Sequence, residues 1–271
     1  MATKKQQQVE APQLELNVTI KDLLEAGAHF GHQTYRWNPK MKRFIFEERN
    51  GLHIIDLAKT MQLLRQSVEV VKDAVRQHKS ILFVGTKKQA KVVVRELAEQ
   101  CNEFYVTERW LGGLLTNPKV REMVKSLDRL EKRIAQGCDG LKKKEIALLC
   151  KEQERLETNL SGIRGMKRLP GLVVVVDPSR EHIAVAEARK LGIPVMGLVD
   201  TNCDPDPIQY VIPCNDDALK SIKQVLMPIV QAVIDVKNEM RVPMMKGDEQ
   251  QESEAELAIE AMAEKLEEVA E

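Results

Sequence analysis

A chain of 271 residues, 43% of them apolar and 30% charged, is long enough to bury a substantial core, so disorder throughout is excluded. No run of about 18 apolar residues occurs, and no apolar stretch follows the N-terminal lysines, so neither a membrane span nor a secretory signal is expected and the predicted location is the cytoplasm. The net charge is zero, but residues 248–271 contain ten acidic residues and one lysine. Residues 1–247 therefore contain 40 basic and 31 acidic residues. This excess of positive charge suits a polyanionic partner without identifying one.

Residues 27–40, with the sequence GAHFGHQTYRWNPK, combine aromatic rings, glycines and cations in a pattern that a plain amphipathic helix does not have. They predict a binding loop in which Tyr35 or Trp37 stacks on an unpaired RNA base while nearby cations contact phosphates. For Trp37 the alternative is burial against Phe44 or Phe46. The predicted phosphate contacts are Arg36, Lys40, Lys42, Arg43 and Arg49.

From residue 53 onward short apolar runs alternate with helical segments, which is typical of a parallel sheet with crossover helices. Because the apolar runs are uniform, we expect strands that are buried on both faces. The predicted fold is therefore α/β, a three-layer α/β/α sandwich with a mainly parallel sheet of the Rossmann-like or flavodoxin-like kind. Thr86 is predicted to cap the helix expected at residues 88–102. The expected strands are residues 53–56, 81–85, 104–106, 172–176, 195–199 and 210–212, and the expected helices are residues 57–78, 88–102, 181–191 and 216–238.

An insertion at residues 117–160 interrupts this alternation with two apolar seams on either side of a glycine-containing segment. Narrow seams on two adjacent helices predict an inserted α-helical coiled-coil hairpin. Lys142, Lys143 and Lys144 follow the turn, so we expect the hairpin to contact RNA, the alternative being a solvated charged face. The seam residues are Val120, Val124, Leu127, Leu130 and Ile134 in the first helix and Ile146, Leu149, Leu156 and Leu160 in the second.

Motifs for nucleotide chemistry are missing, since the sequence has no G-x-G-x-x-G after a strand and no G-x-x-x-x-G-K-[ST]. It also has no G-x-S-x-G elbow, so we expect no enzymatic activity and no small-molecule substrate. Lys87 and Lys88, at a strand-to-helix turn, are predicted as secondary RNA contacts. Arg109 and Trp110 precede two glycines that would let RNA approach the backbone, although both residues could instead be structural.

Three carboxylates and an imidazole are candidate ligands for a divalent ion. Asp200 follows the strand 195–199, Asp216 and Asp217 open the last predicted helix, and His32 lies in the N-terminal loop. Because loops after the carboxyl ends of parallel strands converge on one edge, these side chains can meet and hold zinc or magnesium. The alternative is local structure, in which Asp216 caps the helix, Asp200 begins a turn and His32 forms a local hydrogen bond.

The other histidines and the cysteines predict no further site. His29, between Ala28 and Phe30, is expected to be a core histidine. The five cysteines are odd in number and include no C-x-x-C pair, so we expect reduced thiols that pack as small apolar residues and no structural zinc finger.

Three blocks, in order along the chain, resemble signatures of the bacterial ribosomal protein S2 family: residues 20–31 (IKDLLEAGAHFG), residues 109–117 (RWLGGLLTN), and residues 170–177 (PGLVVVVD) continued by Glu181 and Glu187. The resemblance spans roughly residues 18–240. It implies a structural constituent of the small ribosomal subunit that binds ribosomal RNA and neighbouring ribosomal proteins, including the large messenger-binding ribosomal protein one. It also implies a protruding hairpin, no required cofactor, and a zinc ion near the candidate ligands.

The predicted organisation is a flexible extension at 1–17, an RNA-binding body at 18–116 and 161–240, the hairpin at 117–160 and an acidic tail at 241–271. Without the family resemblance, the residues also allow two other functions. One is a free cytosolic enzyme dependent on a nucleotide or metal, with Asp177, Asp200 and Lys87 as candidates, and the other is a coiled-coil adaptor that binds only proteins. Co-sedimentation with small ribosomal subunits distinguishes these functions.

Overall fold

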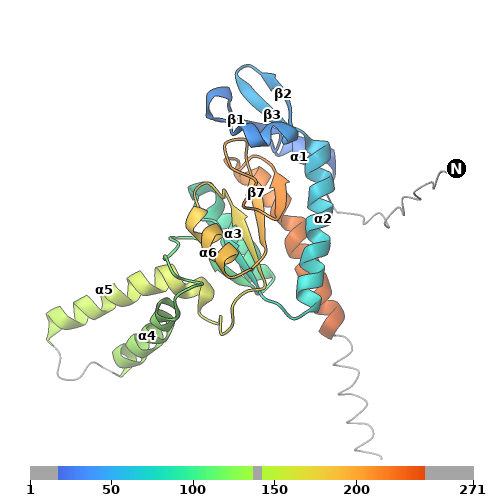
Figure 1. The fold of residues 1–271 in the computed structure, drawn as a ribbon. Coiled ribbons are helices and arrows are strands. Elements are labelled where there is room, and N and C mark those ends of the chain that lie inside the picture. Colours follow the sequence, from blue (N-terminus) through green and yellow to red (C-terminus); the bar gives the residue numbers. More distant parts are fainter. Residues whose placement is uncertain (1–17, 137–141, 242–271) are drawn as a thin grey trace, which may run out of the picture.

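The computed structural model describes residues 18–136 and 142–241, which form an α/β protein built on a five-stranded parallel sheet (Figure 1). The predicted extension at 1–17, the hairpin turn at 137–141 and residues 242–271 of the predicted tail lie outside the described residues. The sheet has the order β5-β4-β6-β7-β8, and every neighbouring pair of strands runs parallel. The predicted class and the mainly parallel sheet are confirmed.

Most elements lie where the sequence pattern predicts them. The strands are β1 (Phe30–Gln33), β2 (Ile45–Arg49), β3 (Leu52–Ile55), β4 (Ile81–Val84), β5 (Phe104–Val106), β6 (Leu172–Val176), β7 (Val195–Val199) and β8 (Tyr210–Pro213). The helices are α1 (Ile20–Glu25), α2 (Leu57–Arg76), α3 (Lys88–Gln100), α4 (Pro118–Ala135), α5 (Lys143–Leu160), α6 (His182–Lys190) and a further helix at 219–241. Short 3-10 helices are η1 (Thr34–Arg36), η2 (Pro39–Phe44) and η3 (Ser161–Ile163).

The parallel sheet is buried on both faces, as its apolar strands predict. Successive side chains of a strand point to opposite faces, so each strand contributes to two cores. Phe83 and Val174 pack with α2, α3 and the helix at 219–241 in one core. Leu82 and Val175 pack with α6 and the body-facing ends of α4 and α5 in the other. Helices therefore cover both faces of the sheet.

The strand predicted at 53–56 has the right position but the wrong partners, because β3 belongs to a separate antiparallel sheet of order β1-β3-β2. Arg49 and Leu52 face each other across a two-residue turn formed by Asn50 and Gly51, whose φ angles are 53° and 73°. Asn-Gly is a strong signal for such a hairpin, since both positions need positive φ. The sequence interpretation missed this signal.

The predicted binding loop at 27–40 is more regular than expected, since it contains β1 and η1 and enters η2. Gly31 lies so close to the segment after β7 that an added Cβ would be 2.6 Å from Cγ2 of Thr201. The hydroxyl of Thr201 accepts a hydrogen bond from the His32 backbone (2.9 Å), and its carbonyl accepts one from the Asn38 backbone (2.8 Å). These contacts hold the N-terminal segment against the carboxyl end of the parallel sheet.

The helix after β8 begins at 219, later than the predicted 216. The side chain of Asn215 accepts hydrogen bonds from the backbone nitrogens of Asp217 (2.8 Å) and Ala218 (3.3 Å). Asn215 therefore satisfies the first free amides of this turn, a role that the sequence analysis gave to Asp216 as an alternative. The carboxylate of Asp216 is left free to face the interior.

The two helices of the insertion, α4 and α5, contact each other and extend away from the body (Figure 1). Leu127, Leu156 and Leu160 of the predicted seams are buried where the helices meet the body. Arg164, just beyond α5, pairs with Asp128 of α4 at 2.7 Å. Coiled-coil packing along the rest of the seams stays a prediction, as does the division into domains.

No helix among the described residues is both long and apolar enough to cross a membrane. Cys101, Cys203 and Cys214 are buried and pack in the two cores, which agrees with the expected role of small apolar side chains.

Candidate functional site

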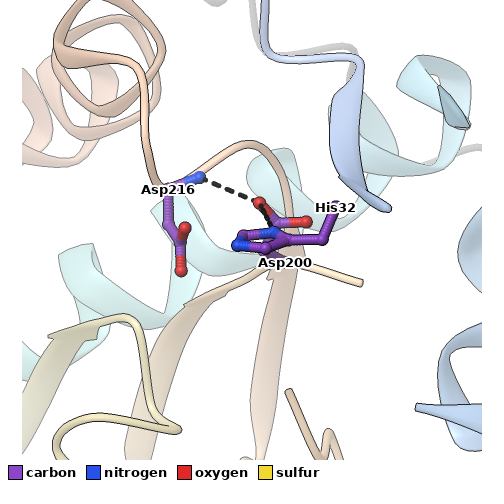
Figure 2. Close-up of side chains that lie close together, drawn as sticks. All are labelled: His32, Asp200 and Asp216. Carbon is purple, nitrogen blue, oxygen red and sulfur yellow. Dashed lines mark hydrogen bonds and ion pairs between the residues drawn. The ribbon is translucent and has the colours of Figure 1, made fainter. Parts of the chain in front are cut away.

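The predicted metal ligands come together at the carboxyl end of the parallel sheet, where Figure 2 shows His32, Asp200 and Asp216. His32 projects from β1, Asp200 follows β7 directly, and Asp216 and Asp217 follow β8. The His32 ring lies beside the carboxylates, with Nδ1 3.1 Å from Oδ2 of Asp200 and Nε2 3.4 Å from Oδ2 of Asp217. The backbone nitrogen of Asp216 lies 3.4 Å from the same Oδ2 of Asp200.

This cluster concentrates buried negative charge. Asp200 and Asp216 are 1% and 0% exposed. Burial raises the pKa of Asp216 to about 7, and the nearby charges of Asp200 and Asp177 act in the same direction. Oδ2 of Asp216 is buried and has no hydrogen-bond partner within the described part of the chain. An unpartnered carboxylate oxygen in a buried position is one that a bound cation would stabilise.

Lys87 lies inside the cluster, a position that argues against its predicted role as an RNA contact. Its Nζ lies 2.6 Å from Oδ1 of Asp216, 2.6 Å from Oδ1 of Asp217 and 3.7 Å from Oδ2 of Asp177. Burial opposes the charge of Lys87, but its hydrogen bonds to Asp216 and Asp217 outweigh this and raise its pKa. An ammonium group fixed by three carboxylates has little left to offer an RNA phosphate.

Among the described residues, two groups of three side chains could hold an ion, and both use Asp216. One ligand atom each from His32, Asp200 and Asp216 lies within 4.8 Å of the others, and Asp177, Cys203 and Asp216 satisfy the same condition. Thiols bind metals as thiolates, and burial raises the pKa of Cys203, which disfavours the second group. The hydrogen bond to Asp200 raises the pKa of His32, and the nearby carboxylates add to this against the effect of burial. Nitrogen and carboxylate ligands suit zinc, so the first group is the better candidate.

The position at which related α/β sheets bind nucleotides is filled by the protein itself. Strand order reverses between β4 and β6, and ligands of doubly wound sheets bind at that switch point. Here Glu181 accepts hydrogen bonds from the backbone nitrogen (3.1 Å) and the hydroxyl of Thr86, and Arg180 donates to the same hydroxyl at 3.1 Å. Thr86 thus binds Glu181 instead of capping α3. Since a buried carboxylate occupies the place of a phosphate, the nucleotide-enzyme alternative loses its site.

Glu187 fixes the loop that carries the second sequence block. Its Oε1 accepts from Nε1 of Trp110 (3.1 Å) and the backbone of Gly113 (2.6 Å). Its Oε2 accepts from the backbones of Leu115 (3.0 Å) and Thr116 (3.3 Å) and from the Thr116 hydroxyl (3.2 Å). Trp110 is 7% exposed, which favours the structural alternative over RNA contact by its side chain.

The aromatic and cationic residues of the N-terminal segment divide into two groups. Tyr35 is 73% exposed, and the Arg36 guanidinium lies 5.3 Å from the centre of its ring. Trp37 is half-buried and lies against His53, with ring centres 5.1 Å apart, and the ring contacts of the described residues include none between Trp37 and Phe44 or Phe46. Tyr35 is therefore the better candidate for stacking on a base.

Lys40 is held by internal ion pairs, with Nζ 2.8 Å from Oδ2 of Asp204 and 2.5 Å from Oδ2 of Asp206. It joins the N-terminal segment to the loop after β7, and its role as a phosphate contact stays a prediction. The other predicted RNA contacts are exposed, namely Arg36, Lys42, Arg43, Arg49, Lys88, Arg109, Lys142, Lys143 and Lys144. Binding of RNA by these residues stays a prediction.

The sequence did not predict the contacts that several residues of the site make. Glu181 and Glu187 stood out only as parts of a resembling block, and nothing in one sequence predicts which loops their carboxylates contact. Asp177 was assigned only to the enzyme alternative, and Cys203 to the core. His29 is half-buried with a ring nitrogen that has no partner in the described residues, so it is only partly a core histidine.

Comparisons with known proteins agree on one family. The model of ribosomal protein S2 matches residues 23–236. The chain is 69% identical over 242 residues to the small ribosomal subunit protein uS2 of Protochlamydia amoebophila, covering 89% of both chains. It is 59% identical over 230 residues to that of Chlamydia abortus, covering 84% of this chain and 83% of the relative, and 56% identical over 246 residues to that of Chlamydia trachomatis serovar D, covering 90% and 87%.

Proposed function

The chain belongs to the ribosomal protein S2 family, and on this premise we propose that it is a structural constituent of the small ribosomal subunit. The observation that carries the proposal is the family match over residues 23–236 together with relatives named as small ribosomal subunit proteins. Its partners are ribosomal RNA and neighbouring ribosomal proteins, and its place of action is the cytoplasm, where bacterial ribosomes work. The protein catalyses no reaction, which is consistent with a switch point filled by Glu181.

Exposed cations around Tyr35 support RNA binding. Within the described residues, Arg36, Lys42 and Arg49 form no ion pair with a carboxylate, so their charges are available to phosphates. Each phosphate contact steepens the dependence of log affinity on log salt by about 0.7 to 0.9. We extend the proposal to the hairpin, in which Lys142, Lys143 and Lys144 lie at the far end of a coiled-coil arm and reach RNA away from the body.

We propose that His32, Asp200 and Asp216 hold one zinc ion. The unpartnered oxygen of Asp216 and the mixture of nitrogen and carboxylate ligands support this choice. When bound, the ion supplies charge compensation and a rigid link, not a reaction. It would join β1 to the ends of β7 and β8, next to the contacts that Thr201 makes with the same segment.

The anchoring of the large messenger-binding ribosomal protein one, implied by the family resemblance, is also a proposal. Phe30 and Phe46 of the small sheet are 46% and 70% exposed. Exposed aromatic side chains are typical of protein interfaces, so this sheet is the surface that we assign to a protein neighbour.

The experiment is incorporation of the full chain into small subunits, measured by co-sedimentation in moderate salt. The double variant Arg36→Ala with Lys42→Ala should lower incorporation several-fold, because two phosphate contacts are lost, while thermal stability changes little. Lys220→Ala with Lys223→Ala, which removes two exposed lysines from the helix at 219–241, is the matched control. If the wild-type chain does not sediment with subunits, the proposal fails, and if both double variants behave alike, the N-terminal segment is not the RNA contact.

A further inference from the structure

A groove of about 350 Å³ lies between α6 and the loop that follows β7, beside the docked N-terminal segment. His182, Val185 and Arg189 line one wall, since residues three or four apart share one side of a helix. Asn202 and Pro207 line the opposite wall. None of the predicted RNA contacts lines this groove, although Lys40 bonds to Asp204 in its wall.

The groove combines apolar lining residues with a rim of unused hydrogen-bond donors. Pro178, Val185 and Pro207 are the apolar part of the lining. In the described parts of the chain, the Arg189 guanidinium has no ion-pair partner and the Ser179 hydroxyl donates no hydrogen bond. The amide nitrogen of Asn202 is likewise free, because only its oxygen is engaged, by the Cys203 thiol at 3.2 Å.

The one acidic residue of the lining, Asp204, is paired. Both of its carboxylate oxygens accept hydrogen bonds from Nζ of Lys40, at 3.1 Å and 2.8 Å, although Lys40 also pairs with Asp206. The unpaired charge that a ligand meets in the groove is therefore the positive charge of Arg189. A ligand that fits must be flat and apolar on its faces, rich in acceptors at its edges, and anionic next to Arg189.

We propose that this groove binds one unpaired nucleotide of ribosomal RNA, with its base between the apolar residues of the two walls and its phosphate on Arg189. The inference rests on the proposed function and adds a specific site to it. An extended peptide fits less well, because its backbone carries no anionic group for the unpaired Arg189 guanidinium, whereas each nucleotide carries a phosphate. Bases of single-stranded RNA offer flat faces and acceptor-rich edges, which this lining matches.

The test uses the full chain and a single-stranded RNA that contains 4-thiouridine, cross-linked by light and mapped by mass spectrometry. Cross-links should fall on residues 179–189 and 202–207, and Ala186→Phe, which places a ring into the groove from an exposed position, should remove them. Arg189→Ala should weaken binding several-fold and lower the salt slope by about 0.7. Lys190→Ala is the matched control, since it removes the same charge from the next residue, which does not line the groove.

The inference is overturned if RNA binds but cross-links only elsewhere, or if the Arg189 and Lys190 variants bind alike. It is also overturned if the groove cross-links to a protein neighbour within assembled subunits. Failure of the proposed function looks different, because the wild-type chain would then neither bind this RNA nor sediment with small subunits.

Discussion

Replacing Glu187 with glutamine tests how much stability one buried carboxylate contributes. Oε1 serves Trp110 and Gly113, and Oε2 serves Leu115 and Thr116. Glutamine keeps the shape, so no cavity forms, but its NH₂ group must face one pair of donors. Two donors lose an acceptor at about 1–3 kcal/mol each, so Glu187→Gln should destabilise the protein by about 2–6 kcal/mol.

Urea unfolding at neutral pH measures this loss, and Glu96→Gln, on the exposed side of α3, is a control expected to stay within about 0.5 kcal/mol. Trp110→Phe removes one donor, so combining it with Glu187→Gln should cost less than the sum of the two changes. A loss below about 1 kcal/mol, equal to that of the control, would show that the five hydrogen bonds do not hold this loop.

Acid should erase the difference between the two proteins. Burial works to raise the pKa of Glu187, but the hydrogen bonds from Gly113, Trp110, Leu115 and Thr116 outweigh it and hold the pKa below its ordinary value of 4.5. A depressed pKa contributes stability that is present above the unfolded pKa and is lost as pH falls through the folded one. The gap between wild type and Glu187→Gln should therefore narrow below pH 4.5, and a constant gap would contradict the assignment.

Two further predictions concern the hairpin turn and the metal. Gly51→Ala should destabilise the protein by about 1 kcal/mol in urea unfolding, because alanine is strained at a φ of 73°. An added Cβ would meet no atom within 4 Å at Gly51 or at Gly112, so neither change causes a clash. Gly112 has no positive φ, so Gly112→Ala is the control and should cost no more than a few tenths of a kcal/mol. Elemental analysis of the purified protein should find one zinc ion per chain. The zinc should be lost in His32→Ala and kept in the control His182→Ala. A wild-type chain that contains no zinc after purification in zinc-containing buffer would refute the site.

The sequence pattern predicted the parallel sheet well because its strands are uniformly apolar and its helices have clear amphipathic spacing. Boundaries of β6 and β7 agree with the predicted 172–176 and 195–199. The errors lie where a strand of ordinary composition can pair with more than one other strand. Strand β3 has ordinary strand composition, and only the Asn50-Gly51 turn assigns it to a hairpin with β2 rather than to the parallel sheet.

The candidate site was only partly predictable, for a similar reason. Convergence of strand ends places Asp200 and Asp216 together whatever the loops do, so topology alone suffices. The partner of a lysine depends on side-chain reach between segments far apart in sequence. Lys40 and Asp204 are 164 residues apart, and Lys87 and Asp216 are 129 residues apart. Single-sequence composition marks all such lysines as candidate RNA contacts, and only the fold separates paired from unpaired cations.

The polar interior of this protein explains how a fold common among nucleotide enzymes serves as inert scaffold. Glu181 closes the switch point with Thr86, and Glu187 gathers the loop after β5 onto α6. Each carboxylate accepts hydrogen bonds from backbone amides that could otherwise bind an external anion. Internal carboxylates thus replace a ligand and rigidify the loops at the same time, and the recognition that we propose uses exposed cations, Tyr35 and the groove beside α6 instead.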